Sequence, residues 1–129
     1  MTLKWDSRYE LGHEKIDAEH RIFLGLIVQF NNLSEQGASM DKLLRTLREI
    51  IKYADFHFVS EENAMIDCSY PDYAHHADLH KQLLVSVENE LFRLNSAEVQ
   101  PADVFDFLFE WFALHTTQED RKLVAFLGQ

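Results

Sequence analysis

The sequence predicts an all-α protein: an up-down-up-down four-helix bundle with an N-terminal arm. Four glycines and two prolines among 129 residues are too few to punctuate many short strands. Hydrophobic residues make up 47% of the chain, enough for a packed core. Apolar residues also recur at steps of three and four in four long segments with short connections. At this length we expect one domain, residues 1–129.

The N-terminal segment, residues 1–16, shows no clear period and is predicted to form an extended arm that Trp5 anchors onto the bundle. His13 lies in this arm without another donor at coordinating spacing, so we do not expect it to bind metal. The arm has no apolar stretch, so we expect no secretory signal.

The first helix is expected to begin after Asp17, a plausible N-cap, and to end near Gln36, with Gly37 closing it. One face of this helix is apolar and is headed by a histidine: His20, Phe23, Leu24, Ile27 and Phe30. A lone histidine in such a place is more often a hydrogen-bonded core residue than a metal ligand.

The second helix is predicted over residues 40–65, with Ser39 as its N-cap. Its apolar face continues into His57 and Glu61, four residues apart and therefore on one side of the helix. A carboxylate in a core costs several kcal/mol unless it is paired or neutralised. The alternative is a salt bridge between His57 and Glu61 near the surface. Glu62 lies about 100° around the helix and can be solvated.

The third helix is expected to start at Pro71 and Asp72. His76 and His80 are again four residues apart and lie on the apolar line of this helix. His75 is rotated by about 100° and is expected at the surface or behind a ligand.

Pro101 is predicted to open the fourth helix, whose inner face ends in His115. Asp120 follows five residues later, about 140° around an ideal helix. It can share a site with His115 only if the backbone deviates there or the side chain reaches back.

Five imidazoles and two carboxylates thus face one predicted core: His20, His57, Glu61, His76, His80, His115 and Asp120. Every helix contributes, as in bundles that bind metal. Two six-coordinate ions offer twelve positions. The five histidines fill five of them, two bridging carboxylates fill four, and a bridging oxo or hydroxo group fills two, so one position stays open. The pattern therefore predicts two metal ions with one open position.

The donor set suits iron; manganese and zinc also suit it, and copper less well. Two ferrous ions, two carboxylates and a hydroxide sum to about +1, a small charge for an apolar core. An open position among aromatic residues suits a small neutral guest, and dioxygen fits.

These elements resemble the hemerythrin family, in particular single-domain bacteriohemerythrins. The resemblance covers nearly the whole chain and rests on Trp5, residues 16–20 (IDAEH), 57–62 (HFVSEE), Tyr70, residues 76–80 (HADLH), and residues 111–120 with their His-x-x-x-x-Asp spacing. It implies a non-haem di-iron site in which Glu61 and Asp120 bridge. His76, His80 and His115 would complete one iron, while His20 and His57 would bind the iron with the open position.

The same resemblance implies reversible dioxygen binding, with dioxygen held as hydroperoxide on the open iron. Our hypothesis is that five neutral imidazoles disfavour higher oxidation states of iron, so the bound peroxide leaves unreacted. Four aromatic residues would keep the pocket dry: Phe23, Phe58, Trp111 and Phe112. Related sequences commonly have an apolar residue where this chain has Thr116. Its hydroxyl either donates to the peroxide or admits water, or it faces the helix backbone without effect.

The leading interpretation is an oxygen carrier, store or delivery protein rather than an enzyme. The alternatives are a di-iron oxidase, peroxidase or nitric-oxide-reducing enzyme, and an oxygen- or redox-sensing module. The net charge of −10 disfavours binding to nucleic acid or an anionic membrane surface. Cys68 is the only cysteine and cannot form an internal disulfide. We expect a cytoplasmic monomer, whose oxygen-consuming partner the sequence does not identify.

Overall fold

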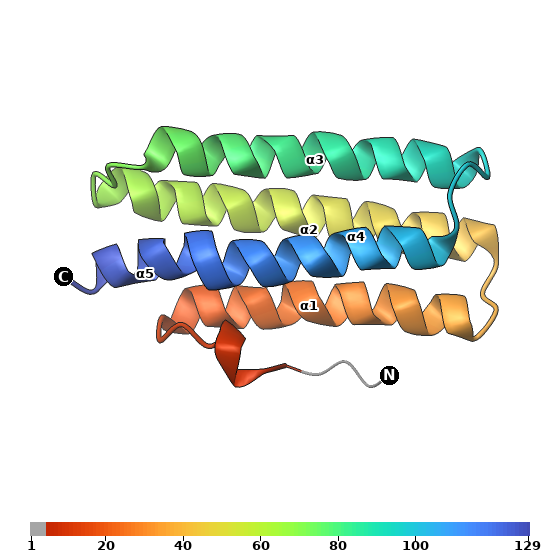
Figure 1. The fold of residues 1–129 in the computed structure, drawn as a ribbon, viewed down its shortest axis with the longest axis horizontal. Coiled ribbons are helices and arrows are strands. Elements are labelled where there is room, and N and C mark those ends of the chain that lie inside the picture. Colours follow the sequence, from red (N-terminus) through yellow and green to blue (C-terminus); the bar gives the residue numbers. More distant parts are fainter. Residues whose placement is uncertain (1–4) are drawn as a thin grey trace.

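The computed structural model describes residues 5–129, and four long helices with alternating directions form its body (Figure 1). Helix α1 packs against α2 and α4, and α3 packs against the same two helices, which confirms the predicted up-down-up-down bundle. The elements are η1 (Ser7–Tyr9), α1 (Glu14–Glu35), α2 (Met40–Asp67), α3 (Tyr73–Asn95), α4 (Pro101–Leu114), η2 (His115–Asp120) and α5 (Arg121–Leu127).

Helix α1 begins four residues earlier than predicted, and Asp17 is not its N-cap. His13 caps the helix instead, because its Nδ1 accepts a hydrogen bond from the Ile16 amide at 3.2 Å. The buried Asp17 carboxylate accepts the backbone amides of residues 11, 12 and 13 at 2.9–3.2 Å. Asp17 therefore holds the entering loop from within the first turns of the helix.

The other helix ends lie close to the predicted positions. Ser39 caps α2 through its hydroxyl, which accepts the Lys42 amide at 3.1 Å. Helix α2 runs two residues further than predicted, to Asp67, whereas α3 starts at Tyr73, just after the predicted Pro71–Asp72 opening. Gly37 adopts a positive φ of 77° after α1, a conformation that glycine adopts without strain.

The described part of the N-terminal arm, from Trp5 on, lies beside α1 (Figure 1) and is anchored by aromatic contacts. Trp5 packs edge-on against Tyr9 with ring centroids 5.7 Å apart, and the Arg21 guanidinium lies 4.9 Å from the Trp5 ring. The arm contains the short helix η1, so its described part is not wholly extended. Residues 1–4 of the predicted arm lie outside the described residues.

A single large core of buried apolar side chains fills the bundle, and a smaller one lies beside α5. Within residues 5–129, the helices are all too short or too polar to span a lipid bilayer.

Candidate metal centre

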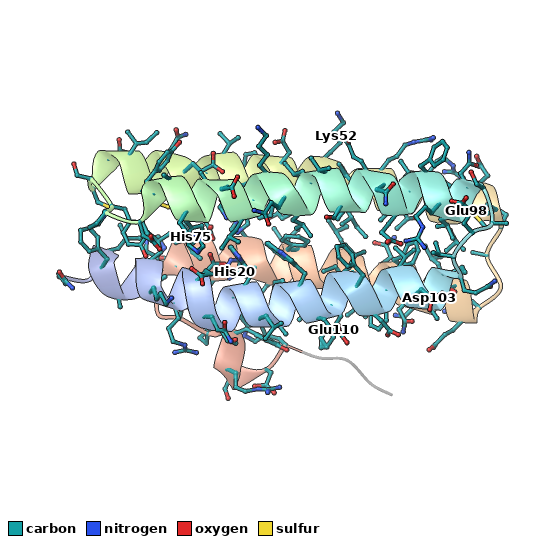
Figure 2. The ribbon with its side chains drawn as sticks, turned by 45° about the horizontal axis from the view of Figure 1, so that its top comes forward. His20, Lys52, His75, Glu98, Asp103 and Glu110 are labelled. Atoms are coloured by element: carbon teal, nitrogen blue, oxygen red, sulfur yellow. The ribbon has the colours of Figure 1, made fainter. Side chains whose placement is uncertain are left out.

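Seven side chains predicted to face the core meet inside one half of the bundle, and each is at most 6% exposed. Figure 2 shows one of them, His20, between the helices, whereas Lys52 points outward. All four helices contribute, with η2 continuing α4: His20 from α1, His57 and Glu61 from α2, His76 and His80 from α3, and His115 and Asp120 from η2.

The two oxygens of the Glu61 carboxylate contact two different groups of histidines. Glu61 Oε2 lies 3.3 Å from His20 Nε2 and 3.0 Å from His57 Nε2. Glu61 Oε1 lies 3.3 Å from His76 Nε2 and 3.1 Å from His80 Nε2. The two carboxylate oxygens thus face opposite ways.

Asp120 repeats this division. Its Oδ2 lies 3.0 Å from His20 Nε2, whereas its Oδ1 lies 3.0 Å from His76 Nε2 and 3.1 Å from His115 Nε2. The cluster therefore consists of a four-donor half (His20, His57, Glu61 and Asp120) and a five-donor half (His76, His80, His115, Glu61 and Asp120), which share both carboxylates.

The backbone between His115 and Asp120 explains how residues five apart reach one site. These residues form a π-helix, η2, in which hydrogen bonds join residues five apart rather than four. The wider turn brings residues five apart nearer to one face of the helix than the separation of about 140° in an α-helix. The π-turn, rather than a long reach of the Asp120 side chain, aligns the two groups.

The five-donor half fits a metal ion, because its inward atoms are buried 3.0–3.3 Å from one another but, among the described residues, none has a well-directed hydrogen bond. These atoms are the Nε2 atoms of His76, His80 and His115, Glu61 Oε1 and Asp120 Oδ1. Each such atom typically costs about 1–3 kcal/mol when left unpaired. Donors about 2.1 Å from one ion and at right angles lie about 3.0 Å apart, close to the distances seen here. A shared cation would satisfy all five atoms.

The carboxylates also shift the pKa values of the histidines. Burial alone lowers a histidine pKa, but Asp120 and Glu61 outweigh it and raise the pKa of His20 to about 9. They raise the pKa of His76 to about 9 in the same way, and mainly Glu61 raises that of His57 to about 10. Burial raises the pKa of Glu61, yet the neighbouring histidines hold it well below its ordinary value. Without metal, protons therefore serve as the counter-charge of the cluster.

The metal-free protein should become less stable as the pH rises. Three folded-state pKa values of about 9, 9 and 10 lie above the unfolded value of 6.5. Their contribution is therefore fully present below about pH 6.5 and is lost as the pH rises through 9 to 10. Urea midpoints of chelator-treated protein at pH 6, 8 and 10 measure this. Metal-loaded protein shares the exposed titratable groups and serves as the control. A midpoint that is level or rising in the metal-free protein contradicts the expectation.

The five residues predicted to form the guest pocket line one narrow space beside the cluster, and this space is too tight to hold a water molecule. These residues are Phe23, Phe58, Trp111, Phe112 and Thr116. Both histidines of the four-donor half, His20 and His57, also line this space, whereas only His115 does so from the other half. The space therefore lies mainly beside the half with fewer donors.

Two aromatic residues also stack on histidines of the five-donor half. Phe58 lies parallel to His80, with ring centroids 4.0 Å apart and an angle of 5°. Trp111 lies 4.3 Å from His115 at 13°. These contacts fix the ring planes of the two histidines.

Two carboxylates behind the cluster were not singled out from the sequence. His57 Nδ1 donates a hydrogen bond to Glu19 at 2.7 Å, and His80 Nδ1 donates one to Glu62 at 2.8 Å. Glu62 is therefore not simply solvated. Its side chain is 26% exposed. The sequence offered one indication of their role, because Glu19 directly precedes His20 and Glu62 directly follows Glu61. Neither residue lies on an apolar helix face, so the periodicity did not point to them.

The remaining histidines lie outside the cluster. His13 caps α1. His75 is exposed, as expected, and its Nε2 lies 3.8 Å from Glu119.

Comparisons with known proteins agree with this geometry. The model of the hemerythrin HHE cation binding domain matches residues 11–127. A bacteriohemerythrin of Clostridium acetobutylicum is 26% identical over 127 residues, covering 93% of this chain and 97% of that protein. A myohemerythrin of Theromyzon tessulatum is 27% identical over 119 residues, covering 92% and 88%.

The fold itself matches that of a solved structure. A crystal structure of wild-type hemerythrin superposes with a TM-score of 0.89 over all of both chains, at 20% sequence identity. The family model spans the four helices and the buried cluster of histidines and carboxylates. The chain therefore belongs to the hemerythrin family.

Proposed function

We propose that this chain binds two iron ions through the seven clustered side chains and binds dioxygen reversibly, as a carrier, store or delivery protein. A bound di-iron pair would supply two electrons, one from each ferrous ion, to the oxygen and take them back when the oxygen leaves. His76, His80 and His115 would hold one ion, His20 and His57 the other, and Glu61 and Asp120 both. The observation that carries the proposal is the partition of the cluster into halves of five and four donors that share both carboxylates.

The place of the narrow space supports an open position in the four-donor half. This half has one protein donor fewer, and both of its histidines border the aromatic space. Phe23 and Phe112 are at most 2% exposed and form part of the walls. Apolar walls of this kind disfavour water and ions beside the open position, because neither finds hydrogen-bond partners there.

Thr116 is the one lining residue whose side chain adds a hydroxyl among the apolar walls, and it is 1% exposed. We expect Thr116→Val, a change of similar shape that removes the hydroxyl, to slow irreversible oxidation of the oxygenated protein. The measurement is the decay of its visible absorption in air against the wild type. Unchanged decay would assign Thr116 a silent role.

The proposal is tested by loading the protein anaerobically with ferrous iron, admitting oxygen and then sweeping with argon. A visible absorption band that appears with oxygen and disappears under argon is the expected result. Steady consumption of oxygen with an added reductant would instead indicate a di-iron oxidase or peroxidase. Failure to bind about two iron ions per chain would overturn the proposed site itself.

A further inference from the structure

The two carboxylates behind the cluster, Glu19 and Glu62, are divided between its halves. Glu19 accepts a hydrogen bond from a histidine of the four-donor half, His57, and Glu62 accepts one from a histidine of the five-donor half, His80. A carboxylate can only accept, so Nδ1 of each histidine carries the proton. Nε2 is then the nitrogen that faces the cluster, where it can give up its own proton and bind a metal ion.

In the four-donor half, fewer contacts hold the histidine rings in place. His20 Nδ1 has no hydrogen-bond partner among the described residues, so Glu19 holds the one histidine of this half that is fixed from behind. Its histidines meet the aromatic rings of the pocket without stacking on them: His20 lies edge-on to Phe112 at 5.8 Å and 82°, and His57 is tilted against Phe58 at 5.9 Å and 50°. In the five-donor half, by contrast, His80 and His115 are stacked on aromatic rings.

Glu19 is itself held in place. Its side chain is 10% exposed, and its second oxygen accepts a hydrogen bond from Ser60 Oγ at 3.2 Å. The Tyr53 hydroxyl donates to the Glu19 backbone carbonyl at 3.0 Å. Glu62 is more exposed, at 26%, and the histidine it holds is also stacked on Phe58.

We propose that Glu19 is the positioning residue that determines whether the four-donor half retains its metal ion. Glu62 plays the corresponding part in the five-donor half with a smaller effect. This inference rests on the proposed two-metal site and deepens it. Loss of Glu19 should leave a protein that holds one ion tightly, in the five-donor half.

The test uses cobalt(II), whose visible absorption reports its ligands, titrated into the full chain against a competing chelator. Wild type should take up two ions. In Glu19→Gln, which keeps the side-chain shape and one acceptor oxygen, the affinity for one ion should fall about 10- to 100-fold. The absorption lost should match that lost in His20→Ala, because His20 belongs to the four-donor half alone.

Three further variants make the comparison specific. Glu62→Gln should weaken the other ion, by a smaller factor, and match His115→Ala. Ser60→Ala should weaken the same ion as Glu19→Gln by less. Glu110 is exposed on α4 (Figure 2). Glu110→Gln removes the same charge and should leave the affinity for both metal ions unchanged.

The outcomes separate the two proposals. If wild type binds two ions and Glu19→Gln binds both as tightly, or weakens both alike, the role of Glu19 is wrong while the metal site stands. If wild type binds no cobalt or iron, the proposed function fails as well. Melting of the metal-free variants identifies any general loss of folding, which would weaken both ions together.

Discussion

Glu61→Ala should abolish binding of two metal ions and leave at most one weakly held metal ion. Glu61 is 1% exposed, and its oxygens lie within 3.3 Å of four histidine nitrogens in both halves. No other side chain supplies a donor to both halves except Asp120 among the described residues. Iron content after gel filtration measures the loss.

The metal-free variant should also be less stable than the metal-free wild type. Breaking one partner out of a buried ion pair typically costs about 3–5 kcal/mol, because the other partner stays buried and unpaired. Urea unfolding at pH 6, below the raised pKa values of His20, His57 and His76, measures this cost. The exposed Glu110→Ala is the matched control and should keep both iron content and stability. If Glu61→Ala still binds two metal ions, the bridging role of Glu61 is wrong.

Phe58→Ala should lower stability and hasten irreversible oxidation of the iron-loaded protein together. Phe58 is 2% exposed, stacks on His80 and lies edge-on to Trp111 at 5.6 Å. Removing a buried phenylalanine ring typically costs about 3–5 kcal/mol. It also opens the space beside the cluster to water and protons. Urea midpoints and the decay of the oxygenated form in air measure the two effects.

Phe30→Ala is the control that separates the loss of stability from the faster oxidation. Phe30 is fully buried in α1, ten residues from His20 and therefore about 15 Å along the helix. We expect a similar loss of stability with unchanged oxidation. Oxidation of Phe58→Ala at or below the wild-type rate would count against a protective pocket.

The fold could be predicted from the sequence because helical periodicity is local information. Few glycines and prolines, together with four apolar faces, sufficed for the bundle. Ser39 and Pro101 marked helix starts correctly, since capping depends on a few neighbouring residues. Asp17 was misassigned because its carboxylate serves loop amides before the helix, a role that only the folded loop reveals.

The seven candidate ligands could also be named in advance, because polar residues on apolar faces are costly unless something pairs them. Which oxygen faces which histidine, the π-turn that aligns His115 with Asp120, and the carboxylates behind the cluster were decided by tertiary structure alone. The physical reason is distance along the chain. Glu19 and His57 are 38 residues apart, and no periodicity within one helix reports on a hydrogen bond between two helices.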